Sequence, residues 1–169
     1  ISYALNGGWN LVSIPGHPES SAREDIFPGA LSLWEWDNSG NDHQYVQADE
    51  LSPGLGYWLN LPSDMSRTLV ADAPVTEEKS LPVGWSLAGV FEDPVSVSQL
   101  KAAAPQIRSV FGYEGAYHLA EVLTPGKGYW VKVIDEPIVA LDVGQFEPAP
   151  APDAAKHNSC HFPTKGYRN

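Results

Sequence analysis

Pro53-Gly-Leu-Gly-Tyr-Trp58 recurs 72 residues later as Pro125-Gly-Lys-Gly-Tyr-Trp130. This repetition indicates that the two halves of the chain form similar structures. An upstream block, Leu5-Asn-Gly-Gly-Trp-Asn-Leu-Val-Ser-Ile14, returns at an offset of 76 as Leu81-Pro-Val-Gly-Trp-Ser-Leu-Ala-Gly-Val90. Because both blocks recur in the same order and at nearly the same spacing, we interpret the pattern as an internal duplication.

The duplication divides the chain into three regions. We expect a first repeat unit at residues 1–76, a second at residues 77–145, and a Pro-rich linker with an extended C-terminal tail at residues 146–169. Trp34-Glu-Trp36 and its counterpart Phe111-Gly-Tyr113 extend the match between the units. A unit of roughly seventy residues buries only a modest core, so we expect the two units to cooperate in folding.

Each unit is expected to contain about five strands. The strand segments are enriched in aromatic and β-branched residues, and Pro-Gly turns precede the strands at 56 and 128. Strands are predicted near 9–14, 31–37, 43–49, 56–61 and 68–71, and again near 85–90, 108–113, 116–121, 128–133 and 137–140.

A short helix is expected after the first strand of each unit. Ser21-Ala-Arg-Glu24 and Ser96-Val-Ser-Gln99 both fit the capping box, in which a hydroxyl and a Glu or Gln three residues later satisfy backbone N–H groups. Pro28 and Pro105 then end the helices at equivalent places. The predicted fold class is mainly β with one short helix per repeat (α+β, β-rich): two homologous small antiparallel-sheet units with a pseudo-twofold relation.

Composition narrows the classes of partner. The 169 residues carry 10 Lys and Arg against 21 Asp and Glu, a formal net charge of -11, and no basic run that could neutralise phosphates, so no nucleic-acid partner is expected. No apolar run approaches the roughly 18 residues that span a bilayer, so we expect the chain not to be membrane-spanning itself.

The single cysteine, Cys160, excludes an intramolecular disulfide. Because the sequence starts at Ile1, we expect a processed N-terminus or a piece of a longer protein.

The motifs at Gly8-Trp-Asn-Leu-Val-Ser-Ile-Pro15 and Pro53-Gly-Leu-Gly-Tyr-Trp58 resemble a repeat of large exported bacterial and archaeal surface proteins. That repeat opens with a Gly-Trp-Asn-Leu block, carries a Trp-x-Tyr-Asp-like strand and ends in Pro-Gly-x-Gly-Tyr-Trp. The resemblance covers nearly all of residues 5–144. The second copy departs from the pattern at Ser86, Gly89 and Phe91. The resemblance implies an accessory, surface-exposed role and brings no active site with it.

Four tryptophans are candidate binding residues: Trp34, Trp36, Trp58 and Trp130. Their rings could stack on sugars, but their recurrence beside apolar strands is typical of a repeated core. Neighbours such as Tyr57 and Trp58 point to opposite faces of a strand, so one of each Tyr-Trp pair is a candidate for exposure. We favour a core role, with glycan binding as the alternative.

The first unit has an extra loop, Asp37-Asn-Ser-Gly-Asn-Asp42, where the second has only residues 114–116. Oxygen side chains at Asp37, Asn41 and Asp42 are hard ligands suited to Ca²⁺. The same residue types build an ordinary hairpin turn, and no bidentate Glu stands at a calcium-loop distance. We favour the turn, with a Ca²⁺ site as the alternative.

No catalytic arrangement stands out. Gly84-Trp-Ser-Leu-Ala88 is only partly similar to a nucleophile elbow around Ser86, since it lacks the second glycine and Asn10 is the counterpart in the first unit. His17, His43 and His118 do not show the spacing of a triad. We therefore expect no enzyme.

The C-terminal tail follows a Pro-rich linker, Glu147-Pro-Ala-Pro-Ala-Pro152, which is expected to be extended. Beyond it, His157, Cys160 and His161 form a cluster that could bind Zn²⁺ or Cu, or attach haem through one thioether, since His157 replaces the first cysteine of a c-type motif. A flexible tail or the start of a further domain is the favoured alternative. We nevertheless predict that residues 147–169 contact another protein chain or a bound group.

These patterns favour a non-enzymatic structural or protein-interaction module of a secreted or cell-surface assembly, located outside the cell, at its surface or in a periplasm. The expected partners are other protein chains, reached through residues 147–169, and no resident cofactor is expected. A carbohydrate-binding module using exposed Trp or Tyr is the first alternative. An accessory subunit whose tail binds a metal or haem is the second.

Overall fold

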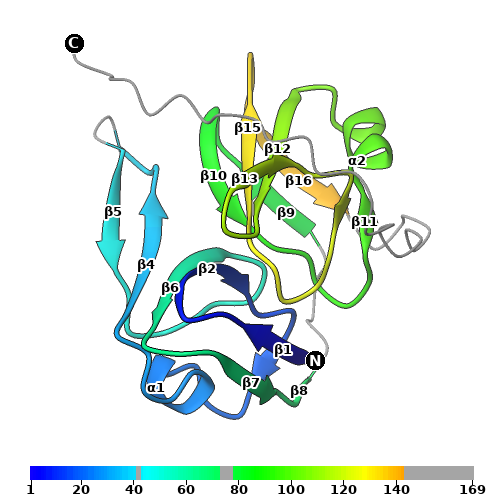
Figure 1. The fold of residues 1–169 in the computed structure, drawn as a ribbon. Helices are drawn as coiled ribbons and strands as arrows, with labels where there is room; N and C mark the ends of the chain where they lie inside the picture. Colours follow the sequence, from blue (N-terminus) through cyan, green and yellow to red (C-terminus); the bar gives the residue numbers. More distant parts are fainter. Residues whose placement is uncertain (41–42, 73–77, 143–169) are drawn as a thin grey trace.

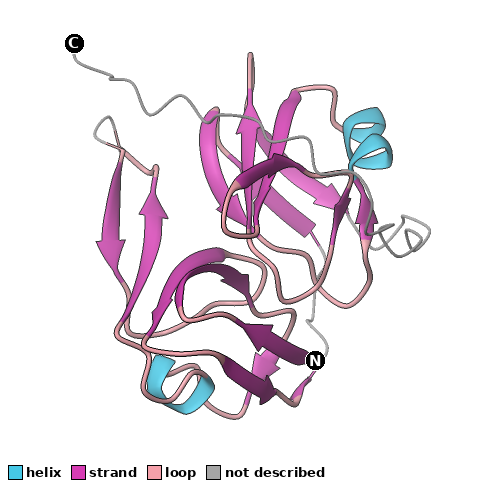
Figure 2. Ribbon diagram, viewed as in Figure 1, coloured by secondary structure: helices cyan, strands magenta, loops and turns pink. Residues whose placement is uncertain are grey.

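Two four-stranded antiparallel sheets form the framework of the protein, with shorter strands and two helices around them (Figure 1 and Figure 2). The computed structural model describes residues 1–40, 43–72 and 78–142. The expected mainly β character, with two short helices, is confirmed.

The two large sheets take their strands from the two halves of the chain in the same order. The first sheet has the order β2-β6-β4-β5, and the second has the order β10-β15-β12-β13. The strand that follows the Pro-Gly turn therefore lies at an inner position in each. The strands are β2 (Gly8–Ser13), β4 (Ser32–Asp37), β5 (Gln44–Gln47) and β6 (Gly56–Leu61), then β10 (Gly84–Ala88), β12 (Ile107–Tyr113), β13 (Tyr117–Leu119) and β15 (Tyr129–Val133).

Four two-stranded sheets are also formed by the described residues. They pair β1 (Ser2–Leu5) with β7 (Met65–Thr68), β3 (His17–Pro18) with β8 (Ala71–Asp72), β9 (Glu78–Leu81) with β16 (Ile138–Asp142), and β11 (Val95–Ser96) with β14 (Val122–Leu123). The sequence did not predict β1 or β9, because both are short and contain polar residues.

The single strand predicted near 68–71 is wrong. The chain changes partner there, since β7 pairs with β1 and β8 pairs with β3. Between them Leu69 is buried, its N–H donating to the Ile1 carbonyl at 2.8 Å, and Val70 is 85% exposed.

The two helices, α1 (Arg23–Ile26) and α2 (Val97–Ala103), end where proline was expected to stop them. Each finishes two residues before Pro28 or Pro105. Ser96 is the N-cap of α2 as predicted, whereas the N-cap of α1 is Ala22 and not Ser21. The capping hydrogen bonds predicted for both helices are wrong, because neither helix has a side-chain cap hydrogen bond.

The helix N-termini are instead tied to backbone. The Arg23 N–H donates to the Asp49 carbonyl at 2.8 Å, and the Val97 N–H donates to the Glu121 carbonyl at 2.9 Å. Each contact satisfies the first N–H of its helix, one of the four donors that have no partner within a helix. No helix of the described residues is long and apolar enough to cross a membrane.

Each large sheet packs against a cluster of apolar side chains on both of its faces. One face of the first sheet packs on a cluster that includes Phe27 and Leu59, and one face of the second packs on a cluster that includes Val110 and Val131. The other faces meet in a third cluster centred on Leu11, Trp58, Leu87 and Trp130. Because side chains alternate along a strand, neighbouring residues of β6 and β15 belong to different clusters.

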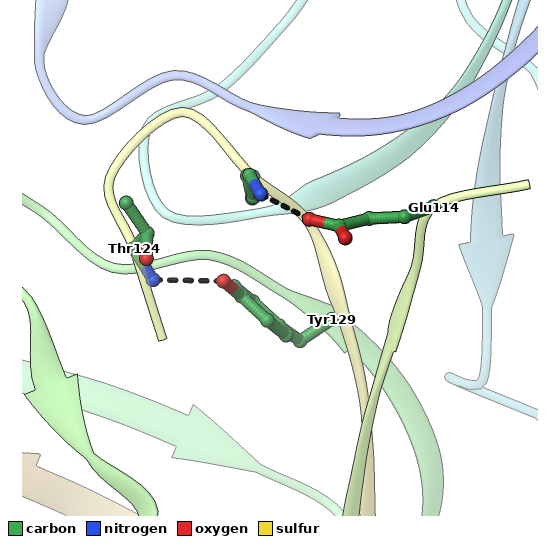
Figure 3. A network of polar contacts seen from close by, with 4 residues as sticks. Glu114, Thr124 and Tyr129 are labelled. Carbon is green, nitrogen blue, oxygen red and sulfur yellow. Dashed lines mark hydrogen bonds and ion pairs between the residues drawn. The ribbon is translucent and has the colours of Figure 1, made fainter. Parts of the chain in front are cut away.

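The tyrosine and tryptophan of each Gly-Tyr-Trp motif are therefore both buried, and the expectation that one of each pair would be exposed is wrong. Tyr57 and Tyr129 are 1% and 3% exposed, and Trp58 and Trp130 are 9% and 3% exposed. Each tyrosine hydroxyl accepts a hydrogen bond of 2.8 Å from the N–H of the residue before its Pro-Gly turn. Figure 3 shows this contact between Tyr129 and Thr124.

Candidate functional site

The two glycines of the Pro-Gly-x-Gly-Tyr-Trp motif have different tasks. Gly54 and Gly126 adopt positive φ angles of 73° and 87°, which only glycine adopts readily. Gly56 and Gly128 sit against the other half of the chain. A Cβ atom on Gly56 would lie 3.0 Å from the Ala88 nitrogen, and one on Gly128 would lie 2.7 Å from the Val12 oxygen.

Backbone hydrogen bonds join the two halves at these turns. The Ser13 N–H donates to the Gly126 carbonyl at 3.0 Å, and the Gly89 N–H donates to the Gly54 carbonyl at 3.0 Å. Ser13 and Gly89 are counterparts in the repeat, as are Gly126 and Gly54. The halves therefore exchange the same bond in both directions.

The loss of the repeat pattern at Gly89 follows from this contact. A Cβ atom on Gly89 would lie 2.2 Å from the Ser13 Oγ, which donates to the Lys127 carbonyl at 2.9 Å. Two counterpart residues face each other here, and there is room for the side chain of only one.

A set of six aromatic side chains, which we call the aromatic seam, fills the space between the two sheets. Trp58 packs edge-to-face on Tyr113 and Tyr117, with ring centroids 4.8 Å and 6.1 Å away. Trp130 packs in the same way on Trp36 and Tyr45, at 5.3 Å and 6.2 Å. Since these partners are counterparts in the repeat, each tryptophan inserts between the aromatic side chains of the opposite half. The six members are Trp36, Tyr45, Trp58, Tyr113, Tyr117 and Trp130.

Burial favours the protonated form of Tyr45 and Tyr117 in the seam. It raises the pKa of Tyr117 to about 12 and also raises the pKa of Tyr45. A hydrogen bond with Trp58 opposes the shift of Tyr45 without reversing it. Both hydroxyls are therefore neutral hydrogen-bonding groups at physiological pH.

One side of the seam opens to solvent as a cavity of about 590 Å³, which we call the aromatic groove. Trp9 and Tyr45 on its wall are 47% and 46% exposed. None of the lining residues is charged. The lining residues are Trp9, Ser32, Trp34, Tyr45, Trp58, Tyr113 and Tyr117.

Trp85 is the counterpart of Trp9 in the second half. The β4–β5 hairpin lies against the strand that contains Trp85. The Trp36 Nε1 donates to the Trp85 carbonyl at 2.9 Å, and the Asn38 Nδ2 donates to the same carbonyl at 3.0 Å and to the Ser86 Oγ at 2.8 Å. Figure 1 shows this hairpin projecting beyond its own half toward β10. The Lys132 ammonium also lies 5.4 Å from the centre of the Trp85 ring, so Trp85 is only partly exposed.

The hairpin of the second half is shorter and makes a different contact. Glu114, in its turn, forms an ion pair with Lys127 of the same half (Figure 3). The difference in hairpin length noted in the sequence thus corresponds to a groove that is open beside Trp9 and a face that is covered beside Trp85.

A partly buried lysine also connects the halves. Lys79 donates to the Gly54 carbonyl, and its ammonium lies 4.5 Å from the centre of the Phe91 ring. Burial lowers the pKa of Lys79 to about 7. Neither Gly54 nor Phe91 lines the aromatic groove, so we treat Lys79 as part of the packing between the halves.

The tryptophans predicted as binding residues divide between two environments. Trp34 and Trp58 line the aromatic groove, whereas Trp36 and Trp130 contact each other on the covered side. Trp9, which the sequence did not single out, is the most exposed tryptophan of the groove. The sequence held no signal for this exposure, because Trp9 and Trp85 stand in equivalent Gly-Trp motifs.

Of the loop residues predicted as Ca²⁺ ligands, Asp37 lies within the described residues. Its Oδ1 accepts from the Ser39 N–H at 2.9 Å and from the Ser39 Oγ at 2.7 Å, and these bonds lower the pKa of the carboxyl. This is the bonding of an Asx turn. Asn41 and Asp42 lie outside the described residues.

The tail cluster of His157, Cys160 and His161 also lies outside the described residues. Within the part of the chain that the structure describes, no group of three or more His, Cys, Asp or Glu side chains could hold a metal ion.

No protein-family model, curated protein or solved structure matches this chain. The aromatic groove is therefore the feature from which a function can be inferred.

Proposed function

We propose that this chain is a non-enzymatic interaction module of a secreted or cell-surface assembly, built from two homologous units with a pseudo-twofold relation. The exchange of equal contacts supports the relation, because an isologous interface makes each contact twice. The bonds between Ser13 and Gly126 and between Gly89 and Gly54 form one such pair. The packing of Trp58 and Trp130 forms another.

The aromatic groove is the recognition surface of the proposed module. The observation that carries this proposal is the exposure of Trp9, which is 47%, while its counterpart Trp85 is only partly exposed. Exposed tryptophan and tyrosine grouped in a concave site are typical of binding surfaces, because they offer large apolar area and a polar tip. The uncharged lining would accept a neutral partner on an otherwise acidic protein.

Carbohydrate binding is the second candidate function, and the same groove supports it. The exposed rings of Trp9 and Tyr45 are of the type that stacks on sugar rings. Ser32 is the one lining residue with a small polar side chain, and sugars usually require more polar partners than this. This scarcity is why a protein partner ranks first.

The exported location is supported by the acidic composition and by the resemblance of the repeat motifs to large surface proteins. Contact of residues 147–169 with another chain remains part of the proposal, as does a metal or haem at His157, Cys160 and His161. Both are open to direct measurement, the second by metal analysis and an absorption spectrum of the purified protein.

The proposed function is tested by screening the full chain against a glycan array and an array of apolar and proline-rich peptides. We expect ligands on one of these arrays to lose at least tenfold in affinity with Trp9→Ala. Val70→Ala is the matched control, because Val70 is 85% exposed and does not line the groove. If no ligand on either array depends on Trp9, the groove is not the recognition surface.

A further inference from the structure

We infer that the side of β5 that faces away from β4, which we call the outer edge, is a further binding site. It takes an extended peptide segment of a partner protein as an added strand, and this segment alternates apolar and basic residues. The inference rests on the interaction role proposed above and places a partner beside the aromatic groove, whose wall includes Tyr45 of β5.

The backbone pairing of β5 leaves four groups on the outer edge. Among the described residues β5 is the last strand of the first sheet and pairs with β4 alone. The Ala48 N–H donates to the Leu33 carbonyl at 2.9 Å. Hydrogen-bonded pairs alternate along an antiparallel ladder, so Val46 bonds toward β4 while the N–H and C=O groups of Tyr45 and Gln47 point away from it. Within the described chain these four groups form no hydrogen bond, and Figure 1 shows β5 on the outer side of its hairpin.

The sequence of β5 lacks the features that protect a sheet edge from pairing. Such edges usually carry lysine, proline or a bulge. β5 reads Gln-Tyr-Val-Gln, it pairs with β4 without a shift of register, and three of its four residues are exposed. An edge of this kind accepts an extended peptide, because main-chain hydrogen bonds supply affinity and the side chains on alternate faces supply specificity.

One face of the β4–β5 hairpin is aromatic. The rings of Trp36 and Tyr45 pack edge-to-face, with their centroids 5.0 Å apart, and Tyr45 is 46% exposed. Side chains that lie opposite each other on neighbouring strands are in contact, so every second side chain of an added strand would lie against this exposed ring. Apolar side chains are therefore expected at these positions of the partner.

The other face of the hairpin is acidic. Glu35 lies opposite Val46, and Asp37 lies opposite Gln44. Neither carboxylate forms an ion pair with a Lys or Arg of the described residues. Neighbouring strands are about 5 Å apart, so β4 would lie about 10 Å from an added strand, a separation that a long basic side chain and a glutamate span together. Basic side chains are therefore expected at the intervening positions of the partner.

Charge also favours such a partner over a second copy of this chain. Two copies that paired through β5 would each carry a formal net charge of -11, and the pairing would bring both acidic hairpin faces together. This repulsion opposes association between copies. A segment with basic residues is attracted by the same charges, which raises its rate of association and sets its register.

The first test measures hydrogen exchange of the full ¹⁵N-labelled chain by NMR. The probe is the peptide Val-Lys-Val-Lys-Val-Lys, and the control peptide Val-Val-Val-Lys-Lys-Lys has the same composition without the alternation. The alternating peptide should slow exchange of the Tyr45 and Gln47 amides at least tenfold, and the control peptide should not. Unchanged exchange at both amides, or equal slowing by the two peptides, would overturn the inference. Slowing that grows with protein concentration in the absence of peptide would overturn it in favour of a second copy.

The second test uses variants of the edge and of the acidic face. Gln47→Pro removes an N–H of the outer edge and leaves the ladder with β4 intact, so it should weaken binding of the alternating peptide at least tenfold. Gln47→Thr is the matched control, because it changes the side chain and keeps the N–H, and it should bind like the wild type. Glu35→Gln should weaken binding at least threefold, whereas Glu92→Gln, outside the hairpin, should not. Equal affinity of Gln47→Pro and the wild type would overturn strand addition.

The outcomes separate this inference from the role proposed for the groove. Ligands that depend on Trp9, together with no protection of Tyr45 by the peptide, would overturn strand addition and leave the groove as a recognition surface. Protection of Tyr45 together with no ligand that depends on Trp9 would support strand addition and overturn the role of the groove.

Discussion

The contacts of single residues between the two halves explain why the repeated motif contains two glycines. Gly54 and Gly126 are required for their positive φ angles, whereas Gly56 and Gly128 are required because the other half lies where a side chain would be. The identical motif Pro-Gly-x-Gly therefore combines one conformational requirement with one packing requirement.

Lys79 is expected to make stability depend on pH. Its folded pKa of about 7 lies below the ordinary lysine value, so between pH 7 and about 10 the unfolded chain binds a proton that the folded chain does not. The free energy of unfolding should therefore rise with pH in this window, by at most about 1.4 kcal/mol per pH unit. Below pH 7 both states are protonated and the dependence ends.

Urea unfolding of Lys79→Met at pH 7, 8 and 9 checks this prediction. The variant should lose most of the rise that the wild type shows. Lys127→Met is the control, since the Lys127 side chain is 53% exposed, and it should keep the rise. Parallel curves for the wild type and Lys79→Met would show that the lysine is not responsible.

At the scale of elements, the β4–β5 hairpin determines which face of the aromatic seam is accessible. Asn38 is its main polar contact with the second half, because one amide group donates to both the Trp85 carbonyl and the Ser86 Oγ. The hairpin is thus held against β10 of the second half.

Asn38→Ala should loosen this cover. We expect a loss of about 1–3 kcal/mol in unfolding free energy, because the Ser86 Oγ loses the Asn38 donor and the Trp85 carbonyl keeps only the donor from Trp36 of the hairpin, together with stronger acrylamide quenching of tryptophan fluorescence. Ser39→Ala serves as the control, since Ser39 bonds only to Asp37 in an exposed turn, and it should change quenching little. Unchanged quenching in Asn38→Ala would mean that other contacts hold the hairpin in place.

Most strands were predictable because their apolar residues recur in both halves, as in Gly56–Leu61 and Tyr129–Val133. The helix ends were predictable from Pro28 and Pro105. The start of α2 after Ser96 was predictable too, but the first N–H group of each helix donates to a backbone carbonyl, of Asp49 or Glu121, that is distant in sequence, and the sequence could not show these contacts.

The candidate site was only partly predictable. Trp34 and Trp58 were singled out as aromatic residues, but the sequence could not show that they face the other half. Trp9 and Trp85 stand in equivalent Gly-Trp motifs, so the sequence could not show that Trp9 is the more exposed of the two. Its exposure depends on which hairpin covers which strand, and this is a tertiary property.

At the scale of the whole molecule, the proposed relation between the halves makes a prediction about Ser13 and Gly89. Gly89→Ser should cost about 1–3 kcal/mol, because the new side chain would overlap with the Ser13 Oγ. Ser13→Gly combined with Gly89→Ser should recover most of this loss, since the single side chain would then occupy the equivalent place on the other side. A double-mutant cycle from urea unfolding measures the coupling. Additive losses would contradict the relation.

The reciprocal insertion of Trp58 and Trp130 has a further consequence for origin. One copy alone would leave its tryptophan without the aromatic pair that receives it, so a single-copy ancestor would have needed to associate as a homodimer with two identical faces. Joining both copies in one gene would have freed the two faces to diverge. One could then acquire a longer hairpin as a permanent cover while the other stayed accessible to ligand.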